Sequence, residues 1–337
     1  MRITLPHGLV LLLQEKNREQ TRELQQAWPW ANQSATGGYT RPRERVPTPK
    51  ILEYEKFRVI GVTPAGRREY LEILVPYLLR QRHILEKHVF WLNTTNTEDL
   101  DYVKGLCRQY PDFFEAIDCP VTVNGNESIS AFFKTTVDHD AIYVRLDDDI
   151  VWLADDAISE LVHFRLRHPE FFLIFGNIIN NSICTYLHQR MGFLSLRVGE
   201  SRPVRYECMD DEGWKNPQTA EEVHDYFLRS LADGRASQYK FDKWVLAEYE
   251  RFSINFMAFF GRDFAAFQGD VGALPGRHCA RQSEEPWLTE YFPKLVGRPN
   301  AINGKALVSH FAYHSQRRYL EGETTLLSRY RQISYSG

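Results

Sequence analysis

The most constraining feature of the sequence is a regular alternation of strand-like and helix-like segments that begins near residue 56. Short apolar runs at residues 56–64, 87–93 and 141–146 have the composition of buried strands, and residues with helical spacing follow the first two runs. Strands that alternate with helices over short connections usually form a parallel sheet. We therefore expect an α/β fold with an open, mostly parallel sheet flanked by helices.

Further elements are expected along the chain. Residues 119–124 are consistent with another strand, and residues 155–169 with a helix that is stopped by a proline. A Thr219 and Glu222 pair has the spacing of a capping box and predicts the start of a helix. Residues 1–50 are rich in proline, glycine and charge, which favours an irregular extension or arm.

Composition excludes several classes of protein. The 337 residues carry a formal net charge of −3, which does not indicate nucleic acid as the main partner. The five cysteines are odd in number and include no CxxC pair, so they suggest a reducing compartment and not a disulfide framework or a zinc site. No apolar run is long enough to be a transmembrane segment. We expect a soluble, cytoplasmic protein, or one from the Golgi lumen if an anchor has been removed.

Three consecutive aspartates, Asp147, Asp148 and Asp149, directly follow the apolar run 141–146. Ligands of open α/β sheets bind beyond the carboxyl ends of the strands. Side chains at positions i and i+2 of an extended segment point the same way, so Asp147 and Asp149 are expected to converge. Two convergent carboxylates suit a hard divalent cation, Mg2+ or Mn2+. The alternative is a solvated acidic turn that caps the next helix.

The stretch "YVRLDDDIVWL" resembles the DXD motif of GT-A-fold glycosyltransferases. The segments "VIGVTPAGRREY", "HVFWLN" and "SISAFFKTT" precede it in the order typical of that family, and the similarity covers about residues 56–320. The resemblance implies one GT-A-like catalytic domain at 51–337, with a nucleotide-binding half at 51–153 and an acceptor half at 154–337. It also implies a nucleotide-sugar donor, most often a UDP-sugar, whose diphosphate is bridged by Mn2+ or Mg2+.

The same resemblance suggests roles for particular residues. Asp149 would be a direct metal ligand, Asp147 would lie near the ribose or the metal, and His310 would complete the shell, in preference to His314. Arginines 317 and 318 would neutralise the departing nucleotide. The expected donor-binding residues are Thr63, Pro64, Gly66, Arg67, Lys134, Arg145, Asp147 and Asp148. Structural roles explain several of these residues equally well. The loop after the first strand is also consistent with an ordinary turn that carries solvated arginines, and Arg145 is also consistent with an ion pair at the edge of the core.

A candidate general base lies in "SEEPWL". Its acidic residues suit the start of a helix, which is sufficient to explain them. In inverting GT-A enzymes an acidic residue at such a position deprotonates the acceptor hydroxyl, so the resemblance suggests Glu285 as the base and Glu284 as its fallback. Asp270, in a glycine-rich stretch, is a further candidate.

These residues together predict a metal-dependent glycosyltransferase that moves a sugar from a nucleotide sugar to a hydroxyl of a carbohydrate or glycoconjugate. A carboxylate base favours inversion, and retention stays open. Two alternatives remain. A nucleotidyltransferase would need a glycine-rich basic loop after the first strand, which "VTPAGRR" matches poorly. A carbohydrate-binding or scaffold protein would keep the fold without the chemistry.

Overall fold

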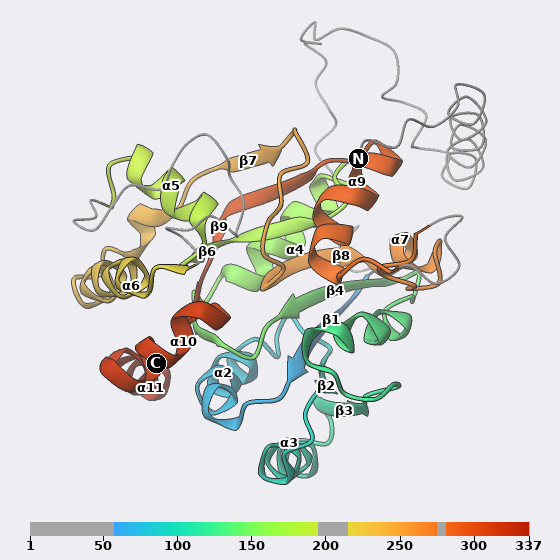
Figure 1. The fold of residues 1–337 in the computed structure, drawn as a ribbon, viewed down its shortest axis with the longest axis horizontal. Coiled ribbons are helices and arrows are strands. Elements are labelled where there is room, and N and C mark those ends of the chain that lie inside the picture. The colour runs from blue at the N-terminus through green and yellow to red at the C-terminus, as the bar shows by residue number, and fades with distance from the viewer. Residues whose placement is uncertain (1–56, 195–214, 275–280, 337) are drawn as a thin grey trace, which may run out of the picture.

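The computed structural model describes residues 57–194, 215–274 and 281–336. The predicted extension at 1–50 lies outside the described residues. A nine-stranded sheet runs through the centre of the molecule and is flanked by helices (Figure 1). Strands from both predicted halves of the domain belong to this sheet.

The sheet has the order β3-β2-β1-β4-β8-β6-β9-β5, and β7 pairs with β9 off this path. Its strands are β1 (Arg58–Ala65), β2 (Lys87–Leu92), β3 (Phe114–Asp118), β4 (Ala141–Leu146), β5 (Ile150–Leu153), β6 (Ile174–Ile179), β7 (Lys243–Leu246), β8 (Phe256–Phe260) and β9 (Asn300–His310). The strands β1, β2, β3, β4, β6 and β9 run in one direction, whereas β5, β7 and β8 run in the other. The expectation of an open, mostly parallel α/β sheet is confirmed.

The α-helices are α2 (Arg68–Arg80), α3 (Thr97–Gln109), α4 (Ala157–Arg167), α5 (Ser182–Arg190), α6 (Pro217–Ala232), α7 (Gly261–Ala265), α8 (Glu284–Pro286), α9 (Phe292–Val296), α10 (His314–Glu323) and α11 (Leu326–Ser336). The remaining helical turns are η3 (Gly125–Glu127), η4 (Ile129–Thr135), η6 (Ala236–Tyr239) and η7 (Trp287–Tyr291).

The predicted capping box of α6 is wrong. The helix begins earlier, at Asn216, whose side chain accepts hydrogen bonds from the backbone amides of Gln218 and Thr219. Asparagine is among the best N-cap residues, and Pro217 occupies the first helical position, where its missing amide proton costs nothing. The predicted strand at 119–124 is also displaced: β3 ends at Asp118 and pairs in parallel with β2.

The centre of the sheet is fully buried. Every residue of β4, β6 and β8 is buried, because helices or other segments cover both faces there. Continuous apolar runs, in place of an apolar and polar alternation, are the pattern expected of such strands. The buried centre gives the loops at the strand ends a rigid support.

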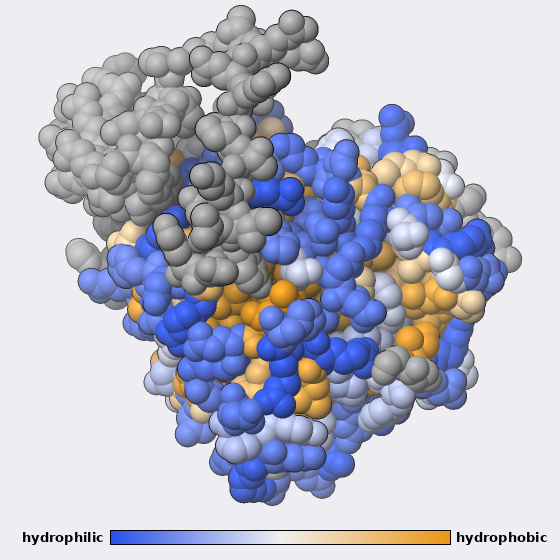
Figure 2. Space-filling view, turned by 180° about the vertical axis from the view of Figure 1, so that it is seen from behind, coloured by the Kyte–Doolittle hydropathy of each residue, from blue (hydrophilic) through white to orange (hydrophobic). Residues whose placement is uncertain are grey.

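Hydrophilic residues cover most of the described surface on the face shown in Figure 2. On this face, hydrophobic residues lie mostly in recesses between hydrophilic ones (Figure 2). Within the described parts of the chain, every helix is too short or too polar to span a bilayer.

Candidate functional site

The three aspartates form a turn at the carboxyl end of β4. The strand ends at Leu146, and the backbone amide of Ile150 donates a hydrogen bond of 3.2 Å to the carbonyl oxygen of Asp147. This bond closes a four-residue turn, after which β5 begins. The rule for alternating side chains applies only to extended backbone, so it fails here. The expected convergence of Asp147 and Asp149 is wrong, and each aspartate has its own partners.

Asp147 joins the turn to β4 and β8. Its Oδ1 accepts a hydrogen bond of 3.1 Å from Nη2 of Arg145, and its Oδ2 accepts one of 2.8 Å from Nδ2 of Asn255. The backbone amide of Asp147 also donates to the carbonyl oxygen of Asn255 at 2.8 Å. Asn255 directly precedes β8, and no sequence motif marks it as part of this site.

Asp148 binds the loop that follows β1. One carboxylate oxygen, Oδ2, accepts hydrogen bonds from the backbone amide of Gly66 at 3.1 Å and from Nε of Arg67 at 3.2 Å. A Cβ atom on Gly66 would lie 3.3 Å from the carbonyl oxygen of Asn93, so a larger residue would be crowded. Gly66, Arg67 and Asp148, all predicted donor-binding residues, therefore lie together.

Asp149 lies among three basic side chains. Its Oδ2 is 3.0 Å from Nη2 of Arg67 and 2.9 Å from Nη2 of Arg317, and its Oδ1 is 3.4 Å from Nε2 of His310. Burial alone would raise the pKa of this carboxyl, but the charges of Arg67 and Arg317 and the contact with His310 hold the pKa well below its usual range. Asp149 is ionised at neutral pH.

Backbone pairing places His310 beside Asp149. In the antiparallel pair of β5 and β9, Ile150 lies opposite His310, and the amide of Phe311 donates to the carbonyl oxygen of Asp149 at 2.9 Å. The two side chains therefore meet at the end of β9. His314, the alternative histidine, is the exposed first residue of α10.

Asp149 and His310 fit two ligands of a divalent cation. Ligands on adjacent positions of a cation lie about 3 Å apart when each bond is about 2.1 Å long, and these two atoms are separated by 3.4 Å. Oδ1 of Asp149 is buried without a hydrogen-bond partner. The described residues contain no group of three or more histidine, cysteine or acidic side chains that could hold a metal, so Asp147 does not complete a third ligand.

Glu284 is the acidic residue that lies beside the turn. It is the first residue of α8, and its Oε1 accepts a hydrogen bond of 3.2 Å from Nη2 of Arg145, the same atom that binds Asp147. Burial raises the pKa of Glu284 to about 7, although the charge of Arg145 opposes this shift. Its second oxygen, Oε2, is buried without a hydrogen-bond partner in the described structure. These are the properties of a base that works near neutral pH.

The other two candidate bases have different surroundings. Glu285 forms an ion pair of 2.7 Å with Nε of Arg251. Asp270 forms ion pairs with Arg281 at 3.0 Å and with Lys134 at 4.0 Å. Lys134 was predicted to contact the donor. In the described structure it forms an ion pair with Asp270, which is not part of the aspartate turn.

The remaining predicted donor-binding residues lie in β1. Thr63 is fully buried, and its hydroxyl lies 3.0 Å from Nε2 of His88, so its side chain is directed into the core. Pro64 is a buried residue of the same strand, which extends to Ala65. Gly66 and Arg67, which follow the strand, are the members of this segment for which hydrogen bonds to the aspartate turn are found in the described structure.

Comparisons with known proteins give a fold likeness and no assignment. No protein-family model matches the sequence, and no curated protein matches it. A mannosyltransferase from Pyrobaculum calidifontis, solved with GDP-Man and Mn2+, is 12% identical, with 98% of this chain and 76% of that chain covered and a TM-score of 0.46. A 4-diphosphocytidyl-2C-methyl-D-erythritol synthase from Anaerococcus prevotii is 9% identical, with coverages of 84% and 98% and a TM-score of 0.44.

A third similar structure is GalNAc-T7 with UDP, GalNAc and Mn2+, at 11% identity and a TM-score of 0.44, with 77% of this chain and 45% of that chain covered. The similar structures therefore include both glycosyltransferases and a synthase with a different activity. At such identities and TM-scores these likenesses carry no argument about chemistry, which has to come from the side chains.

Proposed function

We propose that the chain is a glycosyltransferase that moves a sugar from a nucleotide sugar to an acceptor hydroxyl. The observation that carries the proposal is the buried Arg145, whose Nη2 binds both Asp147 of the DXD-like turn and Glu284. A carboxylate suited to proton abstraction is thereby fixed beside the residues that resemble the donor site.

Glu284 is the proposed base. Its unpartnered Oε2 accepts the proton of the acceptor hydroxyl as the hydroxyl oxygen attacks the anomeric carbon. The bond between that carbon and the donor phosphate oxygen breaks, and the nucleoside diphosphate leaves with the electron pair. A single displacement of this kind inverts the anomeric configuration. Glu284 thus replaces Glu285 as the first choice, because Glu284 shares Arg145 with Asp147 of the turn and keeps one oxygen without a hydrogen-bond partner in the described structure, whereas Glu285 is paired with Arg251.

Basic side chains near the turn suit the donor diphosphate. Arg67 and Arg317 both contact Asp149, and each side chain retains more than a quarter of its exposure, so neither is sealed in the core. Arginine binds phosphate oxygens through paired N–H groups and would neutralise the leaving group. Asp149 and His310 would hold Mn2+ or Mg2+, which when bound supplies further positive charge to the diphosphate. A UDP-sugar is the proposed donor.

The decisive experiment is a panel of sugar nucleotides assayed for hydrolysis and transfer with the wild-type protein, Glu284→Gln and Glu285→Gln. We expect turnover with one nucleotide sugar, its loss in Glu284→Gln and its retention in Glu285→Gln. Release of pyrophosphate from a nucleoside triphosphate would instead identify a nucleotidyltransferase. Sugar binding without turnover of any donor would identify the scaffold alternative.

A further inference from the structure

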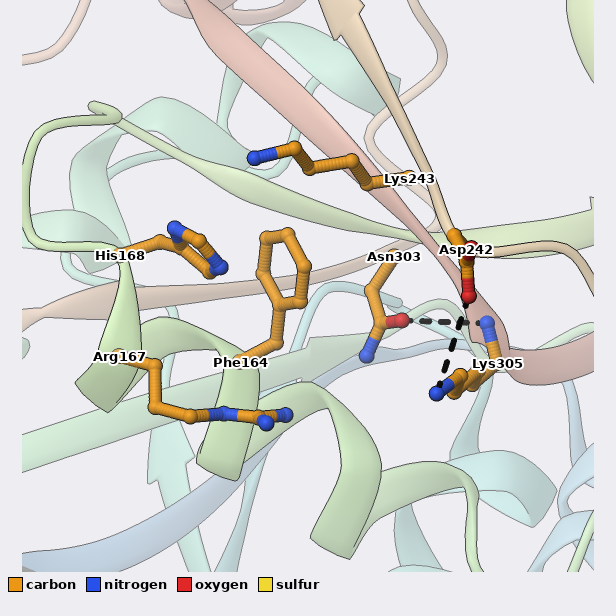
Figure 3. Close-up of a pocket in the computed structure, with 7 residues that line it drawn as sticks. All are labelled: Phe164, Arg167, His168, Asp242, Lys243, Asn303 and Lys305. Atoms are coloured by element: carbon orange, nitrogen blue, oxygen red, sulfur yellow. Dashed lines mark hydrogen bonds and ion pairs between the residues drawn. The ribbon is translucent and has the colours of Figure 1, made fainter. Parts of the chain in front are cut away.

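A separate hollow lies beside the middle of β9, away from the end of the strand that meets the aspartate turn. It has a volume of about 200 Å³ and is lined by Phe164, Arg167, His168, Asp242, Lys243, Asn303 and Lys305 (Figure 3). Lys305 precedes His310 by five residues on β9, which places it on the order of 15 Å along the strand from the candidate catalytic site. The hollow is therefore not part of the site described above.

Three elements converge on the hollow. Phe164 and Arg167 belong to α4, with His168 at its end, Lys243 begins β7, and Asn303 and Lys305 belong to β9. Pairing of β7 with β9 sets Lys243 opposite Asn303. In Figure 3 the ring of Phe164 lies between the side chains of His168, Lys243, Asn303 and Arg167, and so forms an apolar floor.

Positive charge exceeds negative charge around the hollow. Arg167, Lys243 and Lys305 are cationic, and Asp242 is the one acidic residue of the lining. Asp242 lies 3.9 Å from Lys305, and this long contact is exposed. Within the described ranges neither Arg167 nor Lys243 forms a recorded ion pair. The excess is notable because the whole chain has a formal net charge of −3.

The end of α4 does not cancel this charge. The carboxyl end of a helix carries partial negative charge on its free carbonyl oxygens and would repel an anion. Here the buried Arg165 donates to the carbonyl oxygens of His168 and Phe172, and Nε of Arg167 donates to that of His163 at 3.3 Å. The buried Arg165 thus binds the carbonyl oxygen of the C-cap residue His168 from inside the protein, and the exposed Arg167 binds a carbonyl oxygen of the last turn from outside.

We propose that this hollow binds a phosphate-bearing group, a function independent of the glycosyl transfer proposed above. A volume of about 200 Å³ lies below the usual 300–1,000 Å³ of pockets for larger organic ligands, so the occupant is compact. Lys243 and Lys305 supply strong point charges for phosphate oxygens, and Asn303 lies between them. The phosphate belongs either to a small phosphorylated molecule or to a lipid headgroup, which present the same chemistry.

Calorimetric titration of the full chain with inorganic phosphate tests the site. We expect the Lys243→Ala and Lys305→Ala double variant to bind phosphate at least about tenfold more weakly than the wild type, because two charge-assisted contacts are lost. Lys104→Ala, which removes an exposed lysine of α3, is the matched control and should bind as the wild type does. All three proteins should show the same melting temperature, since both replaced lysines of the hollow are exposed.

Flotation with vesicles of phosphatidylcholine, with and without phosphatidic acid, distinguishes the two sources. Capture by phosphatidic acid that the double variant loses assigns a lipid headgroup, whereas phosphate binding without capture assigns a soluble ligand. Equal phosphate binding by the wild type and the double variant would overturn the proposal, because the anion would then be bound elsewhere, for example beside Arg317. Absence of phosphate binding by the wild type would overturn it as well.

Discussion

Nε2 of His310 lies 3.4 Å from Oδ1 of Asp149, although the two residues come from distant parts of the sequence. The antiparallel pairing of Ile150 in β5 with His310 in β9 brings Asp149, the turn residue just before β5, beside His310. His310 lies on a strand and Asp149 on a short turn anchored by β5, and groups held by strands are more rigid than groups on long loops, which would suit the proposed ion site.

If His310 is one of the two proposed ligands, the His310→Ala substitution should weaken Mn2+ binding in the presence of UDP by at least about tenfold. His314→Ala is the matched control and should have no effect, since His314 is exposed on α10. Electron paramagnetic resonance of free Mn2+ measures this affinity directly, without an assay of turnover. Equal affinities in the two variants would remove His310 from the metal site.

Replacement of Glu284 by glutamine should lower the transfer rate by about 10²- to 10⁴-fold, the usual effect of losing a general base. The wild-type rate should fall as the pH drops below about 7, because burial raises the pKa of Glu284 to that value and the base acts only when deprotonated. Glu284→Gln should lose this limb of the pH profile. A profile that is unchanged in Glu284→Gln, or a comparable loss in Glu285→Gln, would point to a different base.

Arg145 should tune the pKa of Glu284. Its positive charge lowers that pKa against the effect of burial, so Arg145→Gln should raise the pKa and shift the acidic limb of the kcat/KM profile to higher pH. The substitution leaves Asp147 and Glu284 without their shared partner and should also cost about 3 kcal/mol of stability. Arg145→Lys keeps the positive charge, so the acidic limb of its kcat/KM profile should lie close to the pH of the wild-type limb. Uniformly lower activity without a shift would indicate a purely structural role.

The sequence predicts the frame of this site better than its contacts. Apolar runs and their helical partners identified β1, β2 and β4, because fully buried strands carry a clear pattern. The aspartates were correctly placed at the end of β4, but their side-chain directions were not, since a turn closed by the bond from Ile150 to Asp147 replaces the extended backbone.

Contacts between distant segments were the least predictable. Asn255 binds Asp147 through both its backbone and its side chain, yet its neighbours in the sequence carry no motif. The order of Glu284 and Glu285 as candidate bases depends on which of them meets Arg145, a contact between two segments that are far apart in the sequence. Local sequence patterns predict where α8 begins, but they do not predict which of its acidic residues contacts Arg145 in the sheet.

Arg317→Ala should raise the KM for the donor by about tenfold, because the side chain that binds Asp149 also carries charge toward the proposed diphosphate site. The neighbouring Arg318→Ala is the matched control, since Arg318 is exposed on the same helix. Steady-state kinetics at varied donor concentration separates this effect from a change in kcat. Equal KM values for both variants would exclude Arg317 from donor binding.

The central sheet should tolerate no side chain at Gly176. A Cβ atom there would lie 2.2 Å from Cδ1 of Phe256 on β8 and 2.9 Å from the carbonyl oxygen of Ala306 on β9, and the backbone atom cannot move away. Gly176→Ala should therefore lower the free energy of unfolding by about 2 kcal/mol through overpacking. Gly322→Ala makes the same chemical change on α10. No described atom beyond the neighbouring backbone of the helix lies within 4 Å of the added carbon, so the change should raise stability by up to about 1 kcal/mol, because alanine favours helix over glycine. Urea denaturation of the two variants measures both values, and a stabilising effect at Gly176 would contradict the close packing of β6 between β8 and β9.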